Sequence, residues 1–203
     1  MTLNLHEAEE IFEEASRTNS GAWVQHSRNV ATAARFIASK DLELEEEKAY
    51  IFGLLHDIGR RKYLSGMNHI LEGYNFLMEK GCEEEARICM THTFAFKDVN
   101  AIYGQWDSSE ADIEIVEKYI NSIQYNEYDL LIQLCDSLAL PNGFALIEKR
   151  FVETALRSGI NSLTLCKWRA VLNIKKYFED KIGCPIYALL PDIVQNTFGK
   201  LEV

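Results

Sequence analysis

Apolar residues recur along most of the chain at spacings of three and four, while strict alternation of apolar and polar residues is scarce. Spacings of three and four put side chains on one face of a helix, so the pattern predicts an all-α protein. Helix-breaking prolines are almost absent from the first two thirds of the chain. The expected helices cover residues 4–16, 21–39, 44–58, 67–80, 83–94, 110–122, 126–140, 144–157, 163–181 and 186–197.

Two stretches interrupt this helical pattern. Asn142 and Gly143 follow Pro141 directly, and this combination predicts a tight turn between two helices. Residues 94–109 show no clear period and include Tyr103. They are therefore either a loop over a functional site or a plain surface connection.

Length and composition are those of an ordinary soluble globular protein. The 203 residues are 47% hydrophobic and 26% charged, which is enough apolar material for a core without disulfide bonds. No repeat, low-complexity tract or Ser/Gly-rich linker divides the chain. We therefore expect a single helical domain over residues 1–203, with the helices of residues 146–203 packed on the preceding ones.

The formal net charge of −10 makes the surface as a whole repel nucleic acid and anionic membranes, so neither is an expected partner. A small phosphorylated substrate would need a local source of positive charge, and a bound metal ion is one such source. The pattern leaves the oligomeric state open.

Several features favour a cytoplasmic location. The longest apolar runs, such as residues 49–55, are far shorter than the roughly 20 residues of a membrane span. Residues 1–20 are acidic and lack the basic and apolar regions of a secretion signal. The five cysteines are odd in number and show no C-x-x-C spacing, which argues against a disulfide framework and a zinc knuckle.

Histidines fall on the apolar faces of several expected helices. His26 lies between Trp23 and Val30 at spacings of three and four. His56 follows Phe52 by four residues. A single histidine in such a position is more often a hydrogen-bonded core residue than a ligand. The same reasoning puts two further histidines on inward faces, His69 and His92.

Two aspartates, Asp57 and Asp136, also face inward, and no lysine or arginine stands at a matching inward position. Carboxylates are rarely buried without a partner, because burying an unpaired charge is costly. Four histidines and two aspartates inside one helical domain are most simply explained by a divalent cation. His6 differs because it lies among glutamates near the terminus, where we expect a structural role only.

Three segments carry a resemblance to a known family: WVQHSRNVATAARFIA, IFGLLHDIGRRKY and LLIQLCDSLALPNG. They resemble the motifs of the HD-domain superfamily of metal-dependent phosphohydrolases, with the pattern H…HD…D. The resemblance covers about residues 22–145 and implies an all-α bundle of the HD-domain type. It assigns no chemistry to residues 146–203. The pattern corresponds here to His26, His56, Asp57 and Asp136.

His69 and His92 are similar to the two additional histidines of a subgroup with dinuclear sites, which includes bacterial diadenosine-tetraphosphate hydrolases. The interval between Asp57 and His69 is shorter than expected for that subgroup, so His69 is the ligand with the weakest support. Arg60 stands where that subgroup commonly has lysine. It keeps the positive charge but has a different geometry.

The resemblance implies two metal ions that share Asp57. The first takes His26, His56, Asp57 and Asp136, and the second takes Asp57, His69 and His92. Imidazole and carboxylate ligands suit Fe, Mn, Co or Zn better than Mg. Such a pair activates water for hydrolysis of a phosphate ester or phosphoanhydride. Asp57 and Arg60 are the expected catalytic residues, with Arg60 contacting a phosphate, and nucleotides are the substrate class by analogy alone.

Two other functions fit the same residues. HD-type di-iron oxygenases use the same six ligands to cleave C–C or C–P bonds with dioxygen. A metal-stabilised helical binding module without turnover is the third interpretation. Hydrolysis is favoured because it is the more common chemistry on this fold and because Arg60, Arg61 and Lys62 form a basic cluster suited to phosphate.

Overall fold

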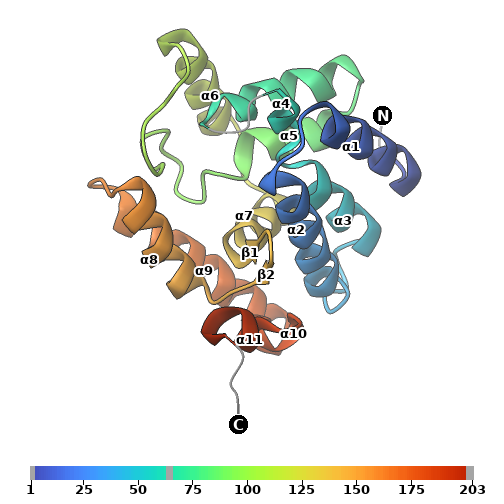
Figure 1. Cartoon of the computed structure of the whole chain (residues 1–203), viewed down its shortest axis with the longest axis vertical. Helices are drawn as coiled ribbons and strands as arrows, with labels where there is room; N and C mark the ends of the chain where they lie inside the picture. Colours follow the sequence, from blue (N-terminus) through green and yellow to red (C-terminus); the bar gives the residue numbers. More distant parts are fainter. Residues whose placement is uncertain (1–2, 63–65, 200–203) are drawn as a thin grey trace.

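The computed structural model describes residues 3–62 and 66–199, and the regular elements of these residues are helices apart from two short strands (Figure 1). The expected all-α fold is confirmed. The N-terminal elements are α1 (Leu5–Thr18), α2 (Ala22–Ala38), α3 (Glu46–Leu55), the 3-10 helix η1 (Ile58–Arg61), α4 (Asn68–Glu79) and α5 (Glu83–Thr91). They are followed by α6 (Glu110–Ser122), α7 (Glu127–Leu138), β1 (Ala139–Leu140), β2 (Gly143–Phe144), α8 (Ile147–Ser158), α9 (Thr164–Ile182), α10 (Ile186–Leu189) and α11 (Ile193–Phe198).

Capping residues explain why three of the helices begin where they do. Asn4 and Glu7 form a reciprocal capping box at the start of α1, and Asn126 and Asp129 form another at the start of α7. At α6, the side chain of Ser109 accepts a hydrogen bond from the backbone N–H of Asp112. Each cap satisfies backbone N–H groups that the first turn of a helix leaves without a partner.

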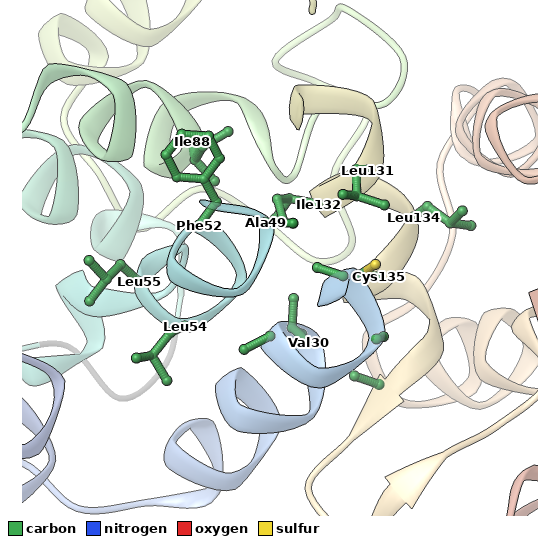
Figure 2. Close-up of a cluster of buried hydrophobic side chains, with 14 of the residues drawn as sticks. Val30, Ala49, Phe52, Leu54, Leu55, Ile88, Leu131, Ile132, Leu134 and Cys135 are labelled. Carbon is green, nitrogen blue, oxygen red and sulfur yellow. The ribbon is translucent and has the colours of Figure 1, made fainter. Parts of the chain in front are cut away.

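The main hydrophobic core lies between α2, α3, α5 and α7. Figure 2 shows Val30 of α2, Phe52 of α3, Ile88 of α5 and Leu131 of α7 pointing into the same space. Residues from α9, α10 and α11 belong to this cluster as well, so the C-terminal helices share the core with the motif-bearing ones. In Figure 1, α7 lies in the middle of the molecule, where it contacts α2, α3, α8 and α9.

Gly53 sets the distance between α2 and α3. A Cβ atom at this position would lie 2.6 Å from the Cα atom of Ala31 on α2. Any larger residue would therefore push the two helices apart. Because α2 carries His26 and α3 leads into His56 and Asp57, this close approach also brings the two motifs together.

A smaller core lies under the connection between α5 and α6. Phe94, Val99 and Ile102 are buried there against Ile70 of α4 and Ile120 of α6. The aperiodic segment of residues 94–109 is therefore anchored by its own apolar side chains. Figure 1 shows it running from α5 toward α8 before it returns to α6.

The turn predicted at Asn142 and Gly143 is confirmed as a small antiparallel hairpin, in which Leu140 pairs with Gly143. Most helical boundaries differ from expectation by one to three residues, and two expected helices are divided. The helix expected over residues 44–58 ends at Leu55 and is followed by the separate 3-10 helix η1, and the helix expected over 186–197 is divided into α10 and α11. Pro191 causes the second division, because proline disfavours helical backbone at the preceding residue, Leu190.

Among the described helices, none combines the length and the hydropathy that a membrane span requires.

Candidate metal centre

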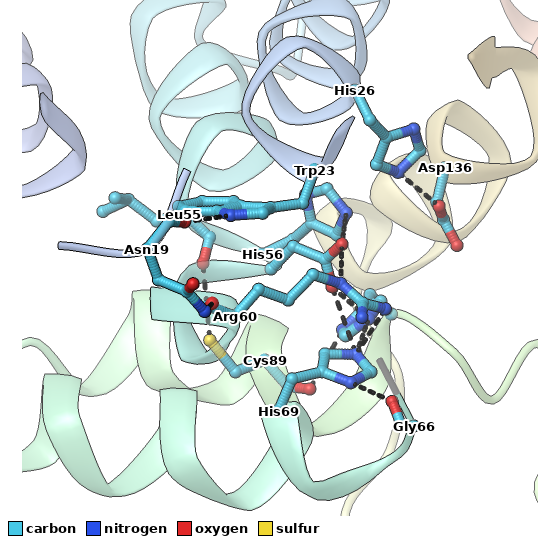
Figure 3. Close-up of polar contacts among 12 residues, drawn as sticks. Asn19, Trp23, His26, Leu55, His56, Arg60, Gly66, His69, Cys89 and Asp136 are labelled. Carbon is cyan, nitrogen blue, oxygen red and sulfur yellow. Dashed lines mark hydrogen bonds and ion pairs between the residues drawn. The ribbon is translucent and has the colours of Figure 1, made fainter. Parts of the chain in front are cut away.

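Five different helical segments bring the predicted ligands into one place. His26 lies in α2, His56 and Asp57 follow α3, His69 lies in the first turn of α4, His92 follows α5, and Asp136 lies in α7. Figure 3 shows His56 and His69 on either side of the Arg60 side chain, with His26 and Asp136 next to each other. All of these side chains are buried except Asp136, whose side chain is 29% exposed.

Gly59 allows α4 to approach the turn that carries Asp57. A Cβ atom on Gly59 would lie 2.0 Å from the backbone oxygen of His69 and 2.6 Å from the backbone nitrogen of Gly73. Only glycine fits between these backbone atoms. The Ile-Gly pair after the His-Asp motif therefore has a physical role, because it lets His69 reach Asp57 despite the short interval between them.

The ligand atoms form two groups that share Asp57. Those of His26, His56 and Asp57 lie within 4.8 Å of one another, and so do those of Asp57, His69 and His92. His69 Nε2 is 3.1 Å from Asp57 Oδ1, and His92 Nε2 is 3.6 Å from the same oxygen. The two Nε2 atoms are 3.4 Å apart. Each group has the residue types and spacing to hold a divalent transition metal ion.

Asp136 lies next to the first group through His26. Its Oδ1 atom is 3.0 Å from His26 Nε2. The rings of His26 and His56 meet edge to face, with their centroids 5.4 Å apart. The structure therefore brings together all six side chains that the sequence predicts as ligands, and their role as ligands stays a prediction.

Three of the histidines are held in one tautomer by the backbone. Nδ1 of His56 donates to the carbonyl oxygen of Gly53 at 2.7 Å, Nδ1 of His69 donates to Gly66 at 2.8 Å, and Nδ1 of His92 donates to Cys89 at 3.0 Å. A carbonyl oxygen can only accept, so the proton is on Nδ1. The Nε2 lone pair of each ring is then left to face the centre, which is the form that binds a metal ion.

Two buried polar atoms at the centre have no hydrogen-bond partner within the described part of the chain, His56 Nε2 and Asp57 Oδ1. The 3.1 Å approach of His69 to Asp57 Oδ1 lacks hydrogen-bond geometry. Buried polar atoms are almost always satisfied, so such exceptions need an explanation. A metal ion between them satisfies both atoms, and imidazole nitrogen and carboxylate oxygen are suitable donors for it. The residues present therefore fit the metal that the resemblance implies.

Burial and neighbouring charges keep the centre in the protonation state that metal binding needs. Burial acts to raise the pKa of Asp57, but the charge of Arg60 and smaller contributions from His56 and His69 outweigh it and hold this pKa well below its usual value. Burial lowers the pKa of His56, and it lowers the pKa of His92 to about 3. The carboxylate is thus ionised and both imidazoles are neutral near pH 7.

The basic residues after the His-Asp motif separate into two environments. Arg60 reaches into the centre, where its Nε donates to Asp57 Oδ2 at 2.6 Å. Arg61 and Lys62 instead pair with Glu72, at 2.8 and 3.2 Å. The prediction of a three-cation cluster at the site is therefore wrong for Arg61 and Lys62. Both form ion pairs with Glu72 on α4 instead.

Two other residues lie away from the centre, and for His6 the sequence predicts this. Arg28, on the far side of α2 from His26, pairs with Glu9 and Glu13 of α1. His6 is exposed and lies near Glu10 of its own helix. Neither contributes to the centre.

A buried polar network behind His92 was not predicted from the sequence. Asp129 has no exposed surface and accepts hydrogen bonds from Arg87 and from Thr91, the residue before His92. Gln133 donates to the backbone oxygen of Thr91 at 3.0 Å. These contacts fix the end of α5, and the inward position of Asp129 on α7 was a signal that could have revealed them.

A cavity of about 340 Å³ opens on the centre. Its wall contains metal-ligand candidates such as Asp57 and His92 together with three cations, those of Arg60, Arg150 and Arg157. The two arginines from α8 lie outside the segment that the sequence resemblance covered, and nothing in the local sequence marked them. The shape and lining permit an anionic small molecule to reach the candidate ligands.

A family model described as the HD domain matches residues 23–140, which is more than half of the chain. The matched range contains His26 and Asp136 and all candidate ligands between them, and it ends before α8 begins. No significant match was found among curated proteins or among solved structures.

Proposed function

The chain belongs to the HD-domain family, and from this premise we propose that it is an enzyme that hydrolyses a phosphate ester or phosphoanhydride of a small molecule. The proposal is carried by one observation: the buried carboxylate of Asp57 is shared by two groups of imidazoles, and a cavity lined with arginines opens on it. Ligands for divalent ions and cations for an anionic substrate are thus combined in one cavity.

In this proposal Asp57 is the ligand common to two ions. The remaining ligands would be His26, His56 and Asp136 on one side and His69 and His92 on the other. When bound, the ions supply Lewis-acid activation of a phosphate oxygen and of the attacking water. Fe, Mn, Co and Zn match the mixture of imidazole and carboxylate better than Mg does.

The chain's own residues have three tasks in this reaction. The backbone carbonyls of Gly53, Gly66 and Cys89 hold the three imidazoles at a fixed orientation, so little reorganisation is needed on binding. Arg60 lies against Asp57 at the cavity wall, where its guanidinium can donate to an oxygen of the phosphate. The buried walls around Asp57 reduce the access of bulk water and strengthen these electrostatic interactions.

Positive charge in the cavity supports hydrolysis over oxygen chemistry. Arg60, Arg150 and Arg157 line a cavity in a chain whose net charge is −10. A phosphorylated substrate uses such a lining for binding and for stabilising the charge that develops during transfer. An oxygenase that cleaves a C–C bond of an uncharged substrate has no need of three arginines around the metal centre.

An anaerobic assay tests the proposed function. The full chain, purified without chelator and supplied in turn with Mn²⁺, Co²⁺, Zn²⁺ or Fe²⁺, is incubated with nucleotides and simple phosphate esters under strict exclusion of oxygen. We expect release of phosphate or of a phosphorylated product with at least one metal. If nothing turns over anaerobically while the iron-loaded protein consumes dioxygen with an organic substrate, hydrolysis is the wrong reaction class.

A further inference from the structure

A second cavity lies beside the metal centre, on the side of the C-terminal helices. It has a volume of about 160 Å³. It shares Thr93, Asp136, Arg150 and Arg157 with the cavity that opens on Asp57, so the two spaces adjoin. A cavity of roughly 150 Å³ can hold a molecule the size of benzene, so a phosphate group also fits.

Three polar residues of α8 line this cavity, beside Phe151 of the same helix. Arg150, Thr154 and Arg157 follow one another at spacings of four and three, which puts them on the same side of the helix. All three line the second cavity. Figure 1 shows α8 between α9 and the connection that leads from α5 to α6.

Lys167 completes the basic wall from the first turn of α9. Its Nζ atom lies 5.0 Å from the centre of the Tyr103 ring, in a cation–π contact. Tyr103 is held in turn by a 2.6 Å hydrogen bond that its hydroxyl accepts from Trp168 Nε1. Asn161, between α8 and α9, donates to the backbone oxygens of Asn100 and Ile102 and fixes the same connection. These contacts therefore fix the walls of the second cavity.

Three cations line the second cavity with a single carboxylate, that of Asp136. Within residues 3–62 and 66–199, none of Arg150, Arg157 and Lys167 forms an ion pair with a carboxylate. The carboxylate that lines the cavity with them, Asp136, is directed at His26. Arg150 and Lys167 are half-buried, and the one carboxylate in the lining leaves an excess of positive charge in this partly desolvated space, which a bound anion would offset. In a chain of net charge −10, their convergence indicates a binding site for an anion.

We propose that Arg150, Arg157 and Lys167 bind a second phosphate group of the substrate while the first lies at the metal centre. The substrate class is then a small molecule with at least two phosphate groups, either joined as a phosphoanhydride or carried separately. This inference rests on the proposed phosphohydrolase function and names its substrate more closely. Arginine contributes paired N–H donors and lysine a point charge, and both are established phosphate ligands. The three residues lie beyond the family match, so this site belongs to the chain's own C-terminal helices.

Methylenediphosphonate is the probe for this site, because its P–C–P bridge resists hydrolysis and it presents two phosphonate groups. Its affinity for the full chain is measured by calorimetry at constant ionic strength, once with Mn²⁺ bound and once after chelator treatment. We expect Arg150→Gln and Lys167→Gln each to weaken binding about tenfold in both conditions, as expected for loss of a hydrogen bond to a charged group. Arg150→Lys and Lys167→Arg retain the charge and should recover most of the affinity.

The matched control is Arg169→Gln. Arg169 is exposed on the same helix as Lys167, and its replacement removes the same charge from the chain without touching the cavity. The affinity of the Arg169→Gln variant for methylenediphosphonate should stay within about twofold of the wild-type value, because exposed charges contribute little at a distance when salt screens them. Circular dichroism of each variant verifies that it is folded.

The outcomes separate this inference from the proposed function. The second phosphate site is refuted if the wild type does not bind the probe. It is also refuted if the affinity of Arg150→Gln and Lys167→Gln for the probe equals that of the wild type or of the Arg169→Gln control. If the Gln variants lose affinity but no phosphate compound is hydrolysed with any metal, the anion site stands and the proposed hydrolase function is wrong.

Discussion

Arg60 and Asp57, three residues apart, are joined by a short hydrogen bond in which Arg60 Nε donates to Asp57 Oδ2 at 2.6 Å. The other carboxylate oxygen, Oδ1, faces the Nε2 atoms of His69 and His92 at 3.1 and 3.6 Å. The two oxygens of Asp57 therefore have different neighbours, a cation on one side and imidazoles on the other. Variants of Asp57, Arg60 and His92 should consequently have distinct effects.

Asp57→Asn tests the shared ligand. The amide keeps the size of the side chain but removes the negative charge that offsets two cations. We expect metal content at both sites to fall and hydrolysis to be abolished, which elemental analysis and the anaerobic assay measure together. Asp180→Asn, at an exposed position on α9, is the control for a lost surface carboxylate. Full metal content and activity in Asp57→Asn would remove this residue from the mechanism.

Arg60→Ala tests the proposed phosphate contact. Loss of the guanidinium should raise the activation free energy, measured through kcat/KM, by about 1.5–3 kcal/mol, the range for a hydrogen bond to a charged group. Metal content should not change, because arginine is not a ligand. The neighbouring Arg61→Ala is the control, since Arg61 pairs with Glu72 and packs on the ring of Phe76. Equal losses in the two variants would contradict a specific role for Arg60.

His92→Ala tests the number of metal ions. It removes a ligand from one group only, so the protein should keep about one ion where the wild type holds two, and it should stay folded. Elemental analysis counts the ions, and anomalous diffraction locates them. A single ion in the wild type, far from His69 and His92, would show that the dinuclear assignment is wrong.

Asp129→Ala tests the polar network behind His92. Asp129 is fully buried and its removal leaves Arg87 without its carboxylate and α7 without its capping box. We expect a loss of about 3–5 kcal/mol in the free energy of unfolding, the usual cost of removing one partner of a buried ion pair. Urea denaturation measures it. Glu114→Gln, which breaks an exposed pair with Lys118, should change stability very little by comparison.

The second phosphate site should also depend on pH. Burial, opposed by the charge of Asp136, lowers the pKa of Lys167 to about 8. Besides Asp136 on α7, the groups that face Lys167 are Tyr103 and, from α8, Arg150 and Arg157. Lys167 is charged below this pKa and neutral above it, so binding of methylenediphosphonate should weaken as pH rises through about 8.

The probe itself gains negative charge as pH rises, so its own titration would strengthen binding and has the opposite sign. The arginine of the Lys167→Arg variant stays charged throughout this range, so its binding of the probe should not weaken as pH rises through about 8. Calorimetry between pH 7 and 9.5 compares the two proteins. Parallel pH profiles for wild type and Lys167→Arg would show that Lys167 does not set the affinity.

The sequence alone was sufficient for the all-α fold and for the six candidate ligands. The spacing of three and four that puts His26 in line with Val30 is a local property, because it depends only on the geometry of one helix. The same holds for the turn at Asn142 and Gly143, whose residues favour it directly. The helix face on which each candidate ligand lies could therefore be predicted without knowing which other helix packs against that face.

Contacts between distant segments were decided only by the tertiary structure. Arg60 and Arg61 are adjacent in sequence, but Arg60 binds Asp57 while Arg61 binds Glu72 of α4. Likewise, no periodicity indicates that Arg150 of α8 would line a cavity with Asp136. A helix pattern shows which side chains face inward, but it does not show which other helix they meet. That depends on how the whole chain packs, including close approaches such as that of Gly59 to the backbone of His69.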